Sequence, residues 1–143
     1  MPGRPGVASD LVLTKKGAEM TAEAEALTAG LAAAWSRGDV EGIVSFFTDD
    51  CVFEDVCGRA VHRGREALRA EAKRVVESDP DLRLEVVSVL GVGGWVAGEW
   101  VQTGTQGGRR YSLRGASILE VRDGKISRES MYTHFDGATW LDA

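Results

Sequence analysis

The stretch CVFEDVCG at positions 51–58 holds two adjacent carboxylates, Glu54 and Asp55, at the end of an apolar run. If this stretch is a strand, its side chains alternate between two faces, and one face carries Cys51, Phe53, Asp55 and Cys57. Because three of these four side chains are apolar or thiols, we expect this face to point inward and Glu54 to point outward. Asp55 would then lie among apolar atoms, where loss of water raises the pKa of a carboxyl group. This environment makes Asp55 a candidate general base or acid.

A structural role explains the same residue equally well. Asp55 could cap the loop that follows it, or it could pair with Arg59 or Arg63. Perturbed carboxylates occur in structural ion pairs as well as in catalytic sites, so the residues alone leave both roles open. Cys57 is a candidate nucleophile, although no base can be identified near it.

The other chemical candidates in the sequence are few. His62 and His134 are the two histidines of the chain, and neither has a carboxylate or thiolate at metal-ligand spacing, so we expect no metal site. The glycine-rich stretch GVGG at 91–94 is interpreted as a hairpin turn, because no helix follows it to cradle a phosphate. We therefore expect no nucleotide or other cofactor.

Composition narrows the class of protein. A chain of 143 residues predicts one domain, and a net charge of −5 argues against binding to nucleic acid or an anionic membrane. No run of 18 apolar residues is present, so no membrane span is expected. Cys51 and Cys57 would be roughly 20 Å apart on one strand, which is beyond disulfide reach. A reducing cytoplasm is the expected compartment.

The expected elements are helices followed by strands. Residues 1–20 contain two prolines and no periodicity, which predicts a flexible arm before a single domain at 21–143. Apolar spacing predicts helices near 22–37, 40–47 and 64–78, and alternation predicts strands near 51–55, 82–86, 95–105, 111–122 and 125–133. This order favours an α+β fold, in which helices pack on one face of a curved antiparallel sheet. The open end of such a cone is a natural pocket.

The sequence also resembles a known superfamily. The segment GDVEGIVSFFTDDCVFEDVCG at 38–58 resembles the start of the ketosteroid isomerases, which are members of the NTF2-like (cystatin-like) superfamily. The later stretches EWVQTGT, LRGASILEVRDGKI and RESMYTHFDGA are similar to those of SnoaL-like polyketide cyclases. The resemblance implies the cone fold inferred above, a hydrophobic small-molecule substrate, and a homodimer formed through the outer face of the sheet.

The resemblance carries over only part of the isomerase site. The general base of the isomerases falls on Asp55, but their oxyanion tyrosine falls on Leu31, their second oxyanion donor near Ser117, and a further pocket tyrosine on Ala72. Loss of one oxyanion donor typically costs about 10²–10³-fold in rate, so steroid isomerisation is not expected. SnoaL-like cyclases often carry an acid on the last strand, where the apolar Met131 or its neighbours fall.

These changes predict a large, apolar pocket that is poor in acids. Its expected substrate contacts are Leu31, Trp35, Phe47, Phe53, Cys57, Ala72, Ser117, Leu119, Glu129, Met131 and Thr133. Each of them could equally be an ordinary core residue.

The pocket favours a cyclase of bacterial secondary metabolism, such as antibiotic biosynthesis, that acts on a bulky hydrophobic polyketide-type intermediate. Holding a flexible chain in a reactive conformation can supply at best about 7–11 kcal/mol, which suits an intramolecular [4+2] ring closure. A second hypothesis makes Asp55 the base of an aldol-type cyclase or a double-bond isomerase. A third is a non-catalytic module for small-molecule binding or dimerisation, and a pocket filled by Trp35, Phe47 and Met131 would favour it.

Overall fold

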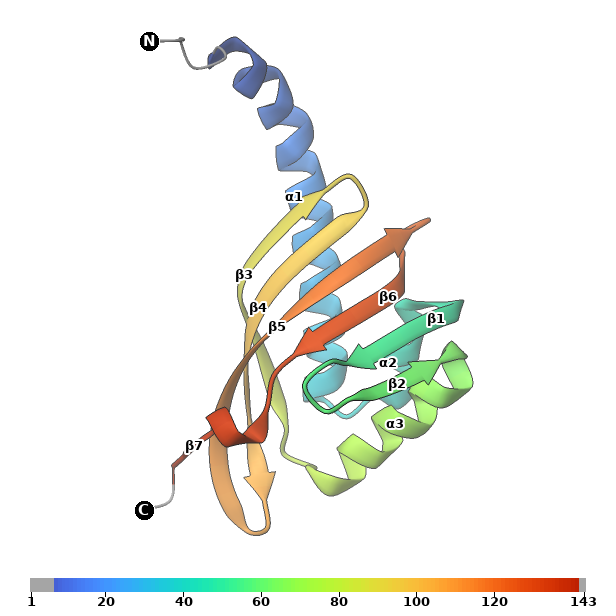
Figure 1. The fold of residues 1–143 in the computed structure, drawn as a ribbon, viewed down its shortest axis with the longest axis vertical. Helices are drawn as coiled ribbons and strands as arrows, with labels where there is room; N and C mark the ends of the chain where they lie inside the picture. The colour runs from blue at the N-terminus through green and yellow to red at the C-terminus, as the bar shows by residue number, and fades with distance from the viewer. Residues whose placement is uncertain (1–6, 142–143) are drawn as a thin grey trace.

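Helices pack beside the strands of the protein (Figure 1). The computed structural model describes the backbone of residues 7–141 and the side chains of residues 21–141. Its helices are α1 (Val7–Ser36), α2 (Val40–Ser45) and α3 (Gly64–Ser78), and a short 3-10 helix, η1 (Phe135–Gly137), lies near the C-terminal end. Asp39 caps α2, because its Oδ1 accepts a 2.9 Å hydrogen bond from the backbone N–H of Gly42.

The strands form one curved sheet. They are β1 (Phe47–Asp55), β2 (Ala60–Arg63), β3 (Arg83–Val92), β4 (Trp95–Gln106), β5 (Arg109–Arg122), β6 (Lys125–Tyr132) and β7 (Thr139–Trp140). The order across the sheet is β2-β1-β6-β5-β4-β3, and β7 pairs with β5. All pairs are antiparallel except β1 and β6, which run parallel, so the expectation of a wholly antiparallel sheet was wrong. The α+β cone itself is confirmed.

The helices cover the concave face of this sheet (Figure 1). Helix α1 packs against β3, and α3 packs against β1 and α2. The core between these layers is apolar; its most enclosed side chains include Ala34, Ile43, Phe47, Cys51, Leu68, Ala72 and Ile126. Ile43 and Val44 of α2 belong to this core, and a cavity lies between α1, α3 and the middle of the sheet.

The helix that opens the domain is longer than the sequence predicts. It begins at Val7 rather than near residue 22, so residues 7–20 of the predicted arm have helical backbone. Figure 1 shows this end of α1 extending past the sheet. Residues 1–6 and 142–143 lie outside the described residues. That residues 1–20 contribute little to the core stays a prediction.

A bulge in β6 changes which of its residues face inward. Glu120 pairs with Arg128, but the next residue of β5, Val121, pairs with Ile126, so the register shifts at Ser127. Simple alternation places Ile126 on the outer face with Arg128, whereas the structure buries Ile126 completely. An extra residue in one strand of a pair has this effect. Beyond the bulge, Glu129 and Met131 both reach the concave face.

Candidate active site

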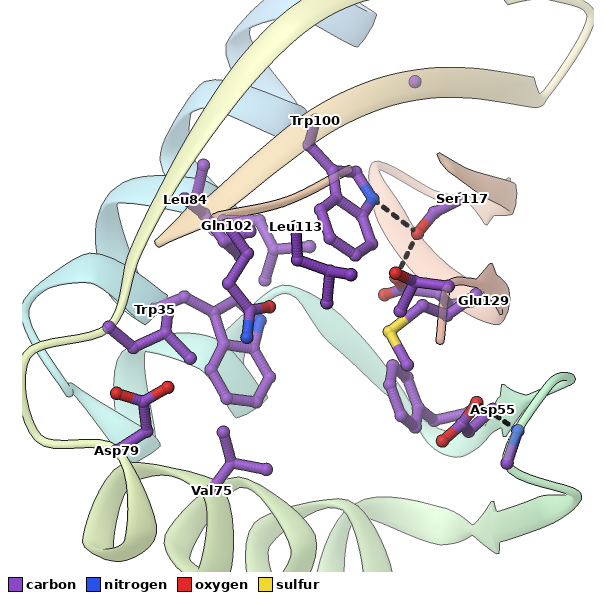
Figure 2. A pocket seen from close by; sticks show the side chains of 18 of the residues that line it. Trp35, Asp55, Val75, Asp79, Leu84, Trp100, Gln102, Leu113, Ser117 and Glu129 are labelled. Carbon is purple, nitrogen blue, oxygen red and sulfur yellow. Dashed lines mark hydrogen bonds between the residues drawn. The ribbon is translucent and has the colours of Figure 1, made fainter. Parts of the chain in front are cut away.

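A cavity of about 510 Å³ lies between α1, α3 and the concave face of the sheet (Figure 2). Its volume is within the range of small-molecule sites. Most of its wall is apolar and comes from α1 and the middle strands: Leu31, Trp35, Leu84, Val86, Leu113, Leu119 and Met131. Trp35 and Met131 line the cavity without filling it.

Glu129 on β6 is a buried carboxyl group in this apolar wall. Its side chain is 7% exposed. Across the strand pair, Ser117 of β5 donates a hydrogen bond from Oγ to Glu129 Oε2 at 2.8 Å. Burial raises the pKa of Glu129 to about 7, although the hydrogen bond from Ser117 acts in the opposite direction. Near neutral pH, Glu129 can therefore both donate and accept a proton.

Trp100 on β4 extends this hydrogen bond into a chain of three residues. Its Nε1–H donates to Ser117 Oγ at 3.1 Å, and an indole nitrogen cannot accept in return. The Ser117 hydroxyl accepts this N–H and donates its own proton to Glu129 Oε2. Gly115 makes the arrangement possible, because a Cβ at that position would lie only 2.3 Å from the Trp100 ring. The chain Trp100–Ser117–Glu129 is drawn with dashed lines in Figure 2.

This hydrogen bond distinguishes the two oxygens of Glu129. Oε2 accepts from Ser117, and a neutral carboxyl accepts best at its carbonyl oxygen, so the proton of neutral Glu129 belongs on Oε1. Among residues 21–141, every buried side-chain nitrogen or oxygen has a hydrogen-bond partner. Glu129 Oε1 has none among those residues, so it is not enclosed by protein and borders the cavity.

Asp55 occupies a different environment at the edge of the cavity. Its Oδ1 accepts a 2.9 Å hydrogen bond from the backbone N–H of Gly58, so the carboxylate caps the turn that follows β1 (Figure 2). It lines the cavity but is only half-buried, whereas Cys51 and Phe53 on the same strand are buried. Glu54 points the other way and pairs with Arg128 at 2.6 Å, which confirms the predicted alternation.

Charged residues of α3 line the cavity close to Asp55. Arg74 pairs with Glu71 at 2.5 Å, and His62 Nε2 lies 3.8 Å from the same carboxylate. Glu71, and to a smaller extent Asp55, raises the pKa of Arg74, while Arg74 lowers the pKa of Glu71. The prediction of a pocket poor in acids was therefore wrong: Asp55, Glu71, Asp79, Glu99 and Glu129 all contribute to its lining.

A second polar chain lies at another part of the wall. Asp79, directly after α3, is 2% exposed. It accepts hydrogen bonds from the backbone N–H of Thr105 at 3.0 Å and from the Tyr111 hydroxyl. The Tyr111 oxygen in turn accepts from Gln102 Nε2 at 2.8 Å. Gly104 leaves room for the Asp79 carboxylate, which a Cβ there would approach to 2.4 Å.

The structure brings most of the predicted pocket residues together. The cavity is lined by Leu31, Trp35, Phe53, Asp55, Ser117, Leu119, Glu129, Met131 and Thr133. Phe47 and Ala72 are enclosed in the core and do not line it. Cys57 is exposed in the turn after β1. Phe47 is the first residue of β1, Ala72 lies on the face of α3 that packs on the core, and Cys57 lies in the turn.

The residues of the two hydrogen-bonded chains were only partly predicted: Trp100, Gln102 and Asp79 of the cavity wall, and Tyr111 behind it, were not. Trp100 and Gln102 lie two residues apart on β4, and the alternation of the stretch EWVQTGT places them on one face, so their shared orientation could have been found. Asp79 and Tyr111 meet only in the folded chain. Asp79 precedes a proline, and the sequence therefore suggests no more than the end of a helix.

Comparison with known proteins identifies the family. A family model of the SnoaL-like domain matches residues 28–129, and the chain belongs to this family. Its fold is that of the ketosteroid isomerase-like proteins in the NTF2-like superfamily, as the resemblance in the sequence predicts. No curated protein matches the sequence. None of the described helices is long and apolar enough to span a membrane.

Three solved structures illustrate the similarity. A hypothetical protein with a ketosteroid isomerase-like fold from Catenulispora acidiphila, in complex with trimethylamine, has a TM-score of 0.73 and 20% identity over 78% of this chain and 87% of that one. An epoxide hydrolase from M. tuberculosis has a TM-score of 0.71 and 21% identity over 82% and 86%. AclR, a proposed hydroxylase from Streptomyces galilaeus, has a TM-score of 0.69 and 25% identity over 82% of each chain.

Proposed function

We propose that this protein is a cyclase of bacterial secondary metabolism that closes a ring in a bulky hydrophobic polyketide-type intermediate. Confinement in the cavity supplies most of the rate enhancement, and Glu129 transfers the proton. The observation that carries the proposal is a carboxyl group whose free oxygen borders an otherwise largely apolar cavity of about 510 Å³. The similar structures described as an epoxide hydrolase and a proposed hydroxylase support small-molecule chemistry in this fold.

Confinement is the first contribution. A flexible chain loses many conformations when the cavity holds it folded, and the reacting carbons then meet without a further loss of entropy. Well-oriented intramolecular reactions gain up to about 7–11 kcal/mol in this way. The wall formed by Leu31, Trp35 and Leu113 offers apolar contacts for this purpose.

Proton transfer by Glu129 is the second contribution. The carboxylate form removes a proton from a carbon next to a carbonyl group of the substrate, and the resulting enolate attacks a second carbonyl carbon in the same molecule. A carbon–carbon bond forms, the attacked oxygen becomes an alkoxide, and Glu129 returns the proton to it. The step is an isomerisation, so it needs no co-reactant. A positioned acid–base group contributes typically about 10²–10⁴-fold.

We propose different roles for the two carboxyl groups from those that the sequence left open. Asp55 is bound to the backbone of Gly58 and is only half-buried, so we propose that it borders the substrate without serving as the base. A plugged pocket would favour a purely structural module, and the volume beside Trp35 and Met131 argues against that alternative. A [4+2] closure is the second candidate, because an apolar wall alone would suffice for it.

Cyclisation of a linear substrate tests the proposal. Purified protein is mixed with a linear poly-β-ketone that carries an N-acetylcysteamine thioester, and the products are separated by chromatography and identified by mass. We expect one cyclised product, formed faster than in buffer. Glu129→Gln should slow its formation by about 10²–10⁴-fold, whereas the matched change Glu120→Gln, at a residue outside the cavity, should not.

Each result decides between the candidates. The same product mixture at the same rate with and without protein would overturn the cyclase assignment. A cyclised product that Glu129→Gln forms at the wild-type rate would instead assign the reaction to confinement alone, as in the [4+2] closure.

A further inference from the structure

Gln102 on β4 presents a hydrogen-bond acceptor to the cavity, and the chain Asp79–Tyr111–Gln102 fixes its orientation. Asp79 is buried and accepts a hydrogen bond at each of its two side-chain oxygens. The backbone N–H of Thr105 binds its Oδ1, and the Tyr111 hydroxyl binds its Oδ2. The single proton of that hydroxyl is therefore committed to Asp79.

The Tyr111 oxygen consequently has only acceptor capacity left. It lies 2.8 Å from Gln102 Nε2, and this contact requires the N–H side of the amide to face Tyr111. Burial and the hydrogen bond to Asp79 keep the pKa of Tyr111 well above its ordinary value, so the hydroxyl stays protonated across the working pH range. The amide of Gln102 thus has one orientation, in which Oε1 points away from Tyr111.

Gln102 Oε1 is left free and accessible. The described residues offer it no donor, yet each of their buried side-chain nitrogens and oxygens has a partner, so Oε1 is not enclosed. Gln102 lines the cavity, and Figure 2 shows its amide near Trp35 and Leu113, two apolar side chains of the cavity wall. A ligand without a hydrogen-bond donor would displace water from this oxygen and leave it without a partner, which costs binding free energy.

The acceptor of Gln102 is separate from the acid–base group. Trp100 is hydrogen-bonded to Ser117, and Gln102 is hydrogen-bonded to Tyr111. In the pairing of β4 with β5, Ser117 lies opposite Gly98 and Tyr111 lies opposite Gly104. These two positions are six residues apart along β4, or roughly 20 Å of strand. In Figure 2, Gln102 and Glu129 accordingly lie on different sides of the cavity.

We infer that Gln102 is a specificity-determining residue whose Oε1 accepts a hydrogen bond from a hydroxyl or N–H group of the substrate, on the part of the molecule away from Glu129. Tyr111 and Asp79 are positioning residues that act through Gln102. The inference rests on the proposed function, because it describes the substrate of the same cavity. The substrate class is then an apolar framework with a hydroxyl or N–H group remote from its reacting carbonyl.

Binding of two isosteric probes tests the inference without any turnover. Equilibrium dialysis compares 2-naphthol, which has the donor, with 2-methylnaphthalene, which replaces it by a methyl group. We expect the full-length wild type to bind 2-naphthol about tenfold more tightly, the effect of one neutral hydrogen bond in an apolar site. Gln102→Leu should reduce the ratio to within about twofold and retain binding of 2-methylnaphthalene. Gln102→Met serves the same purpose if the leucine variant does not fold.

Two further variants separate recognition from general damage. Gln106→Leu is the matched control, because Gln106 lies on the same strand and lines the same cavity, whereas the amide that donates to Tyr111 is that of Gln102; this variant should keep the tenfold ratio. Tyr111→Phe keeps the ring, frees the amide, and should lower the ratio although Gln102 is intact. A purely structural Tyr111 would change stability and leave this ratio alone.

The outcomes also separate this inference from the cyclase proposal. Equal affinity of the wild type for both probes, no binding of 2-naphthol, or a preference that survives in Gln102→Leu would each overturn the role of Gln102. A tenfold ratio that collapses in Gln102→Leu would support it even if no linear polyketide is cyclised. In that case the binding site would stand and the proposed reaction would fall.

Discussion

Ser117 Oγ lies 2.8 Å from Glu129 Oε2 and donates to it, and the same hydroxyl oxygen accepts the N–H of Trp100. The contact joins the neighbouring strands β5 and β6 at the concave face of the sheet. One oxygen of a buried carboxyl group is thereby held by protein, and the other is directed to the cavity. The geometry gives Glu129 a preferred atom for proton exchange.

The first prediction concerns stability and pH. The pKa of Glu129 is about 7 in the folded protein, against an ordinary value of 4.5, so the folded state favours the neutral form. The contribution of Glu129 to the free energy of unfolding is therefore fully retained below pH 4.5 and declines as the pH rises toward 7. Above pH 7 it changes no further. The total loss is on the order of 3 kcal/mol. Glu129→Gln has no ionisable group at this position, so its unfolding free energy should not show this loss.

Urea unfolding of both proteins between roughly pH 5 and pH 8 measures this effect. The unfolding free energy of Glu129→Gln minus that of the wild type should increase with pH across this window. Taking the difference cancels the carboxylates that titrate lower, such as Asp39, whose pKa is lowered by the N–H of Gly42. A difference that is independent of pH would contradict a buried, neutral Glu129.

The second prediction concerns the space beside Ser117. Ser117→Trp places an indole where the cavity wall now has a hydroxyl, so we expect it to abolish turnover and binding of 2-naphthol in a protein that still folds. Ser117→Ala is the control, because it removes the hydroxyl and keeps the space; it should retain 2-naphthol binding. Dialysis and a thermal melt check both variants. Turnover by a folded Ser117→Trp protein would show that the reaction takes place elsewhere.

Local patterns explain why much of the fold could be predicted. The turn Asp123-Gly124 joins neighbouring strands, and alternation within each strand separates Glu54 from Asp55 before any tertiary contact is known. The parallel pairing of β1 with β6 has no such local signal, because the two strands are far apart in sequence. The bulge at Ser127 also depends on two strands at once, so alternation alone misplaced Ile126.

The candidate site shows the same limit. Glu129 could be assigned to the pocket from its face of the strand, but its raised pKa depends on burial by segments from both ends of the chain. Asp79 indicates only a helix end in the sequence, because its partner Tyr111 is remote along the chain. Asp55 was predicted as a candidate acid or base because it ends an apolar run, and the hydrogen bond from Gly58 shows that it caps the turn after β1.

The third prediction concerns assembly. Ile118 on β5 and Tyr132 on β6 are 37% and 46% exposed on the outer face of the sheet, and exposed apolar residues among charged ones are typical of interfaces. We expect a homodimer through this face, seen as twice the chain mass by light scattering at micromolar concentration. Ile118→Glu should shift it toward the monomer, whereas Val61→Glu on β2 should not. A monomer mass for the wild type would rule the dimer out.

The fourth prediction concerns the N-terminal part of α1. The N-terminal end of α1 extends past the sheet (Figure 1), whereas Ala24, Leu31 and Ala34 in the later turns of the helix enter the core. Deletion of residues 1–18 should therefore shift the melting temperature by less than Phe47→Ala, a core truncation of the kind that costs about 3–5 kcal/mol. Thermal melts of the two variants make the comparison. Unfolding of the domain on deletion would mean that this helical segment packs against it.

The fifth prediction compares the two adjacent carboxylates at the end of β1. Asp55→Asn keeps a side-chain oxygen that can accept from the Gly58 N–H, so the turn should survive. The residue borders the cavity without carrying the proton in the proposed reaction, so we expect cyclisation to fall by about tenfold or less, far below the effect of a lost acid–base group. Glu54→Gln removes a partly exposed pair with Arg128 and should cost at most about 1 kcal/mol, with activity unchanged. Initial rates with the linear poly-β-ketone measure both. A loss of 10²-fold or more in a folded Asp55→Asn protein would transfer the proton-transfer role from Glu129 to Asp55.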